Sequence, residues 1–358
     1  MRIFLAGASG VIGRRLVPRL VDEGHQVTAL TRSAEKIGAL REMGAEPVVG
    51  DVLDAERLRP LMVAAAPDVV IQHLTDLPAN LNPRNVKRAY AANDRVRGQG
   101  SANLVAAAAH AGARRYVAQS VSFLYRPAGP HVLEEDAPLW TDAPEPFGRS
   151  IRLHVDMEQR IIDNPHFDGL VLRFGFWYGP GTTFAHDGYT AAQVRRRRYP
   201  IVGDGAAMGQ FIHIDDVASA TVAALDRGAP GAYNITDDDP APMRDWLPAY
   251  AEALGAPPPG TFRPGWLAWS AAGTWSRKPP SCAERRTTRR RTPSIGSRLT
   301  RAGEKASGKR WATGRTSPWQ RPLNAADRLS REGSRHGGRW FRRGAGHRVA
   351  GYRRCGAR

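Results

Sequence analysis

The sequence has 358 residues, enough for one large domain or two small ones, and carries a formal net charge of +18. That charge lies at one end, because residues 275–358 hold 24 of the 52 Lys and Arg residues but 4 of the 34 acidic residues. Residues 1–274 therefore have 28 basic and 30 acidic residues, a balance that gives no electrostatic reason to expect a nucleic-acid partner.

Cysteine content and hydropathy narrow the class of protein further. Both cysteines, Cys282 and Cys355, lie in the basic region, so residues 1–274 offer neither a disulfide framework nor a cysteine metal site. The first residues do not resemble a signal peptide, and the apolar runs are too short to span a bilayer. We expect a cytoplasmic protein with a small-molecule substrate, no membrane partner and no metal, and we leave a homodimer open.

The chain alternates between strand-like and helix-like segments over its first half, which predicts an α/β fold of the Rossmann type. This is a doubly wound parallel sheet, here with a small substrate region at its carboxyl-terminal side. The expected strands are Arg2–Ala6, Gln26–Thr31, Glu46–Gly50, Asp68–His73, Arg115–Gln119 and Gly169–Phe174. The expected helices are Val11–Glu23, Ala34–Met43, Ala55–Ala65, Tyr90–Gly112, Ile151–Asp163, Asp215–Asp226 and Met243–Leu254.

A glycine-rich turn follows the first strand. Its residues are Gly7, Ala8, Ser9, Gly10, Val11, Ile12 and Gly13, with the spacing G-x-x-G-x-x-G. Glycine lets a backbone turn tightly and approach a pyrophosphate, and the helix that follows offers unpaired N–H groups to the phosphates. Strand, glycine turn and helix in this order predict a dinucleotide-binding site.

The end of the second strand indicates which dinucleotide is bound. An acidic residue there would accept hydrogen bonds from an adenosine ribose and repel a 2′-phosphate. This chain has Arg32 instead, between Thr31 and Ser33, and a guanidinium suits a phosphate by charge and geometry. The sequence therefore favours NADP(H) over NAD(H), and the alternative is that Arg32 stacks on adenine or is solvated.

The sequence changes character near residue 273. We expect an NAD(P)-binding domain over residues 1–272, with an embedded substrate region over about 175–272. From 273 to 358 hydrophobic periodicity stops, and Arg, Ser, Thr, Gly and Pro dominate. One interpretation of this segment is a disordered basic tail, because it cannot bury enough apolar surface to offset the entropy of ordering. Another is a tail that binds nucleic acid.

A third interpretation of the tail comes from the genetic code. Read from the third base of each codon, with free choice among synonymous codons, residues 283–291 can spell G-A-S-N-D-K-A-K and residues 299–307 can spell Y-P-S-W-R-E-G-F. We hypothesise a frameshift between about Trp269 and Ser281, so that the tail is out of frame. A mass spectrum of the carboxyl-terminal peptides that matches the given frame would contradict this hypothesis.

Taken together, the motifs resemble those of the extended short-chain dehydrogenase/reductases, and more narrowly the NAD-dependent epimerase/dehydratase group. The resemblance covers roughly residues 1–272, and the shifted frame resembles the usual ending of the family, S-N-x-K-A. The motifs that carry it are Gly7–Gly13, Gly50-Asp51-Val52, the run from Arg173 to Gly181, and the run from Phe211 to Ala218.

The resemblance implies further residues around the cofactor. Asp51 and Val52 follow the third strand, where the family holds the adenine, and Leu74 and Thr75 follow the fourth strand near the expected cofactor ribose. Asn93 lies on the long helix and faces the sheet. An ordinary buried amide is the alternative interpretation for Asn93.

The chain departs from the family in its catalytic residues. The family uses Y-x-x-x-K on the helix before Gly169, with a nearby Ser or Thr, so that a phenol can exchange a proton as hydride moves. Here Phe147 and Ile151 occupy the tyrosine and lysine positions, and neither can exchange a proton. Ser122 and Tyr125 are the candidate substitutes, and the proton can also come from water.

The resemblance therefore implies an enzyme, an NAD(P)-dependent oxidoreductase or epimerase/dehydratase. It would transfer a hydride to or from a small carbonyl or hydroxyl compound, which can be derived from a sugar. The missing pair at Phe147 and Ile151 keeps a second interpretation open, in which the chain binds NADP(H) as a sensor or scaffold without redox turnover.

Overall fold

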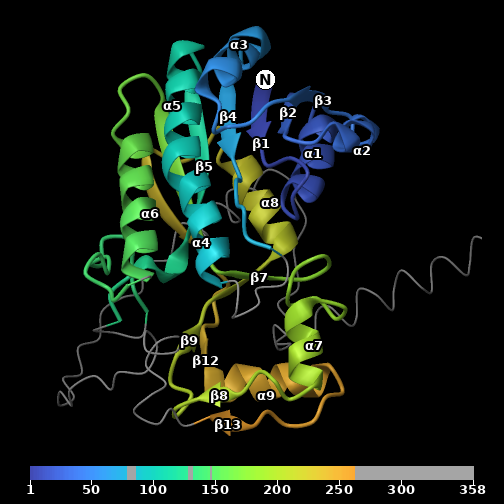
Figure 1. Ribbon diagram of the computed structural model, residues 1–358, viewed down its shortest axis with the longest axis vertical. Helices are drawn as coiled ribbons and strands as arrows, with labels where there is room; N and C mark the ends of the chain where they lie inside the picture. The colour runs from blue at the N-terminus through green and yellow to red at the C-terminus, as the bar shows by residue number, and fades with distance from the viewer. Residues whose placement is uncertain (79–85, 128–131, 146, 263–358) are drawn as a thin grey trace, which may run out of the picture. The chain divides into compact units, whose positions relative to one another are not determined.

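Seven parallel strands form the central sheet of the computed structural model, which describes residues 1–78, 86–127, 132–145 and 147–262 (Figure 1). The strand order is β11-β6-β5-β4-β1-β2-β3. This order reverses direction between β1 and β4, which is where ligands bind in doubly wound sheets. The predicted Rossmann-type fold is confirmed. The strands are β1 (Arg2–Ala6), β2 (Gln26–Thr31), β3 (Glu46–Val49), β4 (Val69–Gln72), β5 (Arg115–Val121), β6 (Asp168–Phe174) and β11 (Gly231–Ile235).

Helices cover both faces of this sheet (Figure 1). On one face α1 packs against α8, and Leu16 and Leu20 of α1 are fully buried in the same apolar cluster as Val217 of α8. On the other face α3, α5 and α6 bury a second cluster that includes Leu58, Leu104 and Met157, among others. These helices are α1 (Gly13–Asp22), α2 (Ile37–Glu42), α3 (Ala55–Ala65), α4 (Val86–Arg95), α5 (Ser101–His110), α6 (Phe147–Ile162) and α8 (Ile214–Ala223).

The long helix expected over Tyr90–Gly112 is interrupted in the structure. A π-helical turn, η2 (Val96–Gly100), lies between α4 and α5. Single π turns inside α-helices occur often at functional sites. Gly100 ends this turn close to the loop after β3, since a Cβ on it would lie 2.8 Å from Cγ2 of Val52. The turn also places Arg97 in the interior, where its side chain is 3% exposed.

Beyond β6 the chain builds the smaller carboxyl-terminal region. Three pairs of short strands are present in it: β7 (Phe176–Tyr178) with β10 (Phe211–His213), β9 (Met208–Gly209) with β12 (Ala241–Pro242), and β8 (Ile201–Val202) with β13 (Thr261–Phe262). Its helices are α7 (Tyr189–Arg195) and α9 (Met243–Ala253). An aromatic cluster fills it, made of Phe176, Phe184, Phe211, Trp246 and Tyr250.

Two predictions concern parts of the chain outside this description. The predicted disordered or out-of-frame tail, residues 273–358, lies outside the described residues, as do the last ten residues of the predicted substrate region. Within the described part of the chain, none of the helices combines the length and apolar character that crossing a membrane requires.

Candidate functional site

The glycine turn forms a cradle that side chains would fill. Gly7 follows β1 with φ of +104°, and a Cβ on it would lie 2.3 Å from the carbonyl oxygen of His73, which follows β4. Gly13 opens α1, and a Cβ there would lie 2.1 Å from the carbonyl oxygen of Ala8. The turn is closed by the N–H of Gly10, which donates to the carbonyl of Gly7 at 3.0 Å.

This cradle fits a dinucleotide pyrophosphate. It lies between β1 and β4, where the strand order reverses. Ile12, the residue before α1, has no polar side chain to cap the helix, so the first N–H groups of α1 are free of a side-chain cap. Unpaired N–H groups at a helix start attract phosphate oxygens, and here these must precede Arg14, whose N–H donates to the carbonyl of Gly10 at 3.0 Å. The predicted site residues Ser9, Gly10, Val11 and Ile12 lie in this turn.

One cationic side chain contacts the turn, and a second follows the neighbouring strand β2. Arg32 follows β2, is half exposed, and donates from Nη2 to Oδ1 of Asp76 at 3.0 Å. Lys36 lies one helical turn later, and its Nζ donates to Oγ of Ser9 at 3.4 Å. Arg32 was predicted from the sequence, whereas Lys36 was missed. Its spacing of four residues from Arg32 at the start of a predicted helix could have indicated it.

The loop after β3 is fixed by two hydrogen bonds. Oδ1 of Asp51 accepts from the N–H of Leu53 at 2.9 Å, and the carbonyl of Val52 accepts from Nδ2 of Asn103 at 2.8 Å. The Val52 side chain is buried, whereas Asp51 is partly exposed. The structure thus places both predicted adenine-side residues in an ordered loop at the carboxyl edge of the sheet.

Asn93 holds the loop after β4. Its Oδ1 accepts from Oγ1 of Thr75 at 3.1 Å and from the backbone N–H of Asp76 at 3.2 Å. Asn93 is 3% exposed, while Leu74 is partly buried and Thr75 is exposed. Because the buried amide supports the loop rather than facing solvent, Asn93 positions Thr75 and Asp76 beside the predicted cofactor ribose.

Helix α6 places packing residues where the family has its proton-transfer pair. Phe147 opens α6 and makes an edge contact with Trp140, with ring centres 6.1 Å apart. Ile151 is 1% exposed and packs against Leu124 and Ala143. One turn later His154 is buried, although histidines at such positions are more often on the surface. Burial lowers the pKa of His154 to about 4, so this ring is neutral at pH 7.

The two candidate catalytic residues differ in their surroundings. Ser122 follows β5, is 2% exposed, and its Oγ has no hydrogen-bond partner among the described residues. The hydroxyl of Tyr125 donates to Oδ1 of Asn234 at 2.6 Å and accepts from Nη1 of Arg173 at 2.8 Å. Burial raises the pKa of the Tyr125 phenol. The buried Ser122 hydroxyl thus has no hydrogen-bond partner among the described residues, whereas the Tyr125 proton is already engaged.

A buried ionic network lies below these residues, and it was not predicted from the sequence. Glu158 of α6 accepts from Nη2 of Arg173 at 2.5 Å, from Nε of Arg173 at 3.1 Å, and from Oγ of Ser120 at 2.5 Å. Arg97 donates from Nη1 to the carbonyl of Gln119 at 2.6 Å. Burial lowers the pKa of Arg97 to about 10, which leaves it charged at pH 7.

The spacing of Ile151, His154 and Glu158 places all three on one face of α6, and this spacing could have indicated a buried carboxylate. A buried carboxylate would in turn require a cationic partner on a neighbouring strand, and Arg173 lies within β6. Among the described residues, no three His, Cys, Asp or Glu side chains gather in a way that could hold a metal ion.

Comparison with known proteins now adds to this geometry. Residues 3–236 match the model of the NAD dependent epimerase/dehydratase family. The chain belongs to this family. The family and the relatives below are oxidoreductases and epimerases, which confirms the prediction of an enzyme of this class.

Two curated relatives of this chain are named as reductases. The chain is 45% identical over 263 residues to 3-diazoavenalumate denitrifying reductase of Streptomyces sp, which covers 73% of this chain and 84% of that protein. It is 28% identical over 260 residues to a 4-hydroxy-2-methyl-3-oxo-4-farnesyl-3,4-dihydroquinoline-1-oxide ketoreductase of Stigmatella aurantiaca. This match covers 71% of this chain and 74% of that protein.

The fold is also similar to that of solved family structures. One is the UDP-glucose 4-epimerase of Thermus thermophilus in complex with NAD, with a TM-score of 0.59 and 22% identity. The match covers 74% of this chain and 87% of that one. At this identity the likeness supports the fold, and the glycine cradle supports the cofactor independently.

Proposed function

We propose that this chain is an NADPH-dependent reductase that transfers hydride to a carbon bearing a diazonium group, with loss of dinitrogen, in a small aromatic acid. The observation that carries the proposal is the replacement of a proton-transfer pair by Phe147 and Ile151, where Ile151 is buried in a small apolar cluster and Phe147 packs against it. The name of the Streptomyces reductase, a denitrifying enzyme acting on a diazo compound, supports the same chemistry.

Carbonyl substrates and diazonium substrates differ in whether their reduction needs a proton. Bound NADPH supplies a hydride, which is two electrons and one proton. A carbonyl carbon that accepts it leaves an alkoxide, which a nearby acid must protonate. A diazonium carbon forms a C–H bond with the hydride while its C–N bond breaks, and the electron pair of that bond leaves with N₂. No further proton is consumed, so the absence of a proton donor at positions 147 and 151 does not slow this reaction.

Side chains near the end of β5 suit a flat ring with a polar substituent. Phe123 stacks on Phe176 with ring centres 5.4 Å apart and an angle of 13° between the ring planes. Phe176 is 37% exposed. The unpartnered hydroxyl of Ser122 is adjacent in sequence to Phe123. We propose that Ser122 contacts the substrate and that the ring pair supports it.

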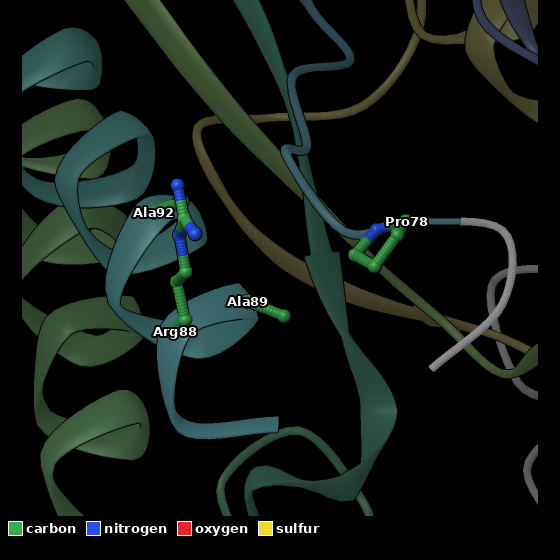
Figure 2. Close-up of a pocket in the computed structure, with 4 residues that line it drawn as sticks. All are labelled: Pro78, Arg88, Ala89 and Ala92. Atoms are coloured by element: carbon green, nitrogen blue, oxygen red, sulfur yellow. The ribbon is translucent and has the colours of Figure 1, made fainter. Parts of the chain in front are cut away.

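A pocket beside the loop after β4 can receive the acidic group. It is lined by Pro78 on that loop and by Arg88, Ala89 and Ala92 of α4 (Figure 2). Figure 2 shows the Arg88 side chain running along α4 toward Ala92, opposite Pro78. Because the other lining residues are apolar, a carboxylate there would meet Arg88 as its counter-ion.

The preference for the phosphorylated cofactor follows from Arg32 and Lys36. Lys36 contacts Ser9 of the glycine turn and Arg32 follows β2, and we propose that an adenosine 2′-phosphate would be balanced by these two positive charges. Use of NAD remains the alternative, since the family as a whole is defined by NAD.

The proposal is tested with the full chain, NADPH and 4-carboxybenzenediazonium, with the reaction without protein subtracted. We expect protein-dependent oxidation of NADPH, equimolar release of N₂, and one deuterium at the former diazonium carbon when NADPH carries deuterium at C4. The matched ketone, 4-carboxyacetophenone, should be reduced at least about a hundredfold more slowly for lack of a proton donor. Equal reduction of both compounds would contradict the proposal. If the protein binds NADPH but reduces neither the diazonium compound nor the ketone, the result would favour the second interpretation, a sensor or scaffold without redox turnover.

Substitution of Tyr125 separates its two proposed roles. If the phenol belongs to the buried network, Tyr125→Phe should lower the free energy of unfolding by about 1–2 kcal/mol and leave kcat within about twofold. In contrast, Ser122→Ala should raise KM with little effect on stability, because its Oγ has no partner to lose among the described residues. A hundredfold loss of kcat in folded Tyr125→Phe would instead identify Tyr125 as the proton donor that the sequence predicted.

A further inference from the structure

Asp76 and Arg32 join two loops at the edge of the dinucleotide cradle. The guanidinium of Arg32 donates to the Asp76 carboxylate at 3.0 Å, and their side chains are 55% and 34% exposed. The backbone of Asp76 is fixed at this place, because its N–H donates to the buried amide oxygen of Asn93. The carboxylate is therefore held beside the same cation that would receive a 2′-phosphate.

We propose that Asp76 is a residue that sets dinucleotide specificity, by competing with the 2′-phosphate of NADP for Arg32. This inference rests on the proposed function, in which Arg32 binds that phosphate. In the structure Arg32 donates to the Asp76 carboxylate. When NADP binds, the phosphate shares the guanidinium with a carboxylate of like charge.

The sign of the effect follows from the charges involved. A phosphate monoester carries a charge of about −1.5 to −2 at pH 7, so a carboxylate a few ångströms away repels it. NAD has a neutral hydroxyl at the same position, which can donate a hydrogen bond to the carboxylate. Asp76 therefore weakens NADP binding relative to NAD binding. Lys36, which contacts Ser9, offsets part of this repulsion from the other side.

The variant Asp76→Asn tests the inference with little risk to the fold. The amide keeps the size of the side chain and an oxygen for Arg32, and the bond from the backbone N–H to Asn93 is unaffected. We expect NADP⁺ to bind about three- to tenfold more tightly to this variant, because the interaction between two partly solvated charges has this magnitude. The dissociation constant of NAD⁺ should change by less than about twofold or rise. The gain should shrink at high salt, which screens exposed charges.

Asp168→Asn is the matched control. Asp168 also pairs with an arginine, since its Oδ2 lies 3.8 Å from Nη1 of Arg115, and its side chain is exposed. It begins β6, at the amino ends of the strands and away from the cradle. This variant removes the same unit of charge and should leave both dissociation constants unchanged.

Calorimetry of the full chain with NADP⁺ and with NAD⁺ decides between the outcomes. An equal change for both dinucleotides, or no change for either, in Asp76→Asn overturns the inference. If the unaltered protein binds only NAD⁺, the proposed preference for NADPH fails. Even then, a gain of NADP⁺ binding by Asp76→Asn would support the competition, and its absence would refute it.

Discussion

Replacing Glu158 by glutamine should lower the free energy of unfolding by about 3–5 kcal/mol, because it removes one partner of a buried ion pair. Glu158 is 2% exposed and Arg173 is 5% exposed, so water cannot replace the lost charge. Arg97, also buried, would lose the attraction of the same carboxylate, which raises its pKa. Glutamine keeps the shape of the side chain, so the change isolates the charge. Urea denaturation of the variant and the unaltered protein measures the difference.

The matched control is Glu145→Gln, in an exposed ion pair with Arg152. The two side chains are 60% and 47% exposed, and pairs of this kind contribute about 0–1 kcal/mol. Equal destabilisation by both variants would show that burial does not set the value of the Glu158 pair. A stable Glu158→Gln variant with the native near-ultraviolet spectrum would show that the network is rebuilt by other groups.

Much of the fold could be predicted because its cause is local. The strands β1 and β2 and the helix α3 begin and end where the apolar pattern and the flanking polar residues place them. The glycine turn could be predicted because its spacing reflects a steric requirement, and the contacts of a Cβ at Gly7 and Gly13 show that requirement directly. Local patterns of this kind need no knowledge of which strands lie side by side.

The buried charges could not be predicted in the same way. Glu158 and Arg173 are 15 residues apart, and Tyr125 and Arg173 are 48 apart, so their pairing depends on the order of β5, β6 and α6. The same holds for Asn93, whose partner Thr75 lies 18 residues earlier on another element. The burial of Glu158 and of Asn93 is indicated by the helix faces on which they lie, but only the strand order shows which polar groups must satisfy one another.

The site itself was predicted in part. The sequence identified Phe147 and Ile151 as departures from the proton-transfer pair, and the structure adds that Ile151 is integral to a small apolar cluster. Restoring a tyrosine and a lysine would therefore also disrupt the packing of this cluster, since the buried position 151 has no room for a solvated ammonium group. The replacement residues take part in the packing around α6. We therefore favour a reaction that needs no proton donor over a chain that has lost its activity.

Replacing Gly13 by alanine should weaken dinucleotide binding by about a hundredfold or more, equivalent to roughly 2.7 kcal/mol. A Cβ at this position would lie 2.1 Å from the carbonyl oxygen of Ala8 and 2.5 Å from that of Gly7. Both are backbone atoms of the turn, so they cannot rotate away as a side chain would. The turn must open, and the N–H groups at the start of α1 then no longer point at the phosphates.

Two other glycines separate this effect from a general cost of adding a methyl group. Gly38 lies within α2, and a Cβ added there would have nothing within 4 Å, so Gly38→Ala should bind the dinucleotide normally and gain up to about 1 kcal/mol of stability. Gly10 would place its Cβ 3.2 Å from the carbonyl oxygen of Gly7, a smaller conflict that predicts an intermediate loss of affinity. Calorimetric titration with NADP⁺ and NAD⁺, on variants whose melting curves show a folded protein at the titration temperature, gives the three affinities. From the tightest to the weakest binding, the order should be Gly38→Ala, Gly10→Ala and Gly13→Ala. A folded Gly13→Ala variant that binds within about threefold of the unaltered protein would mean that the phosphates are held elsewhere.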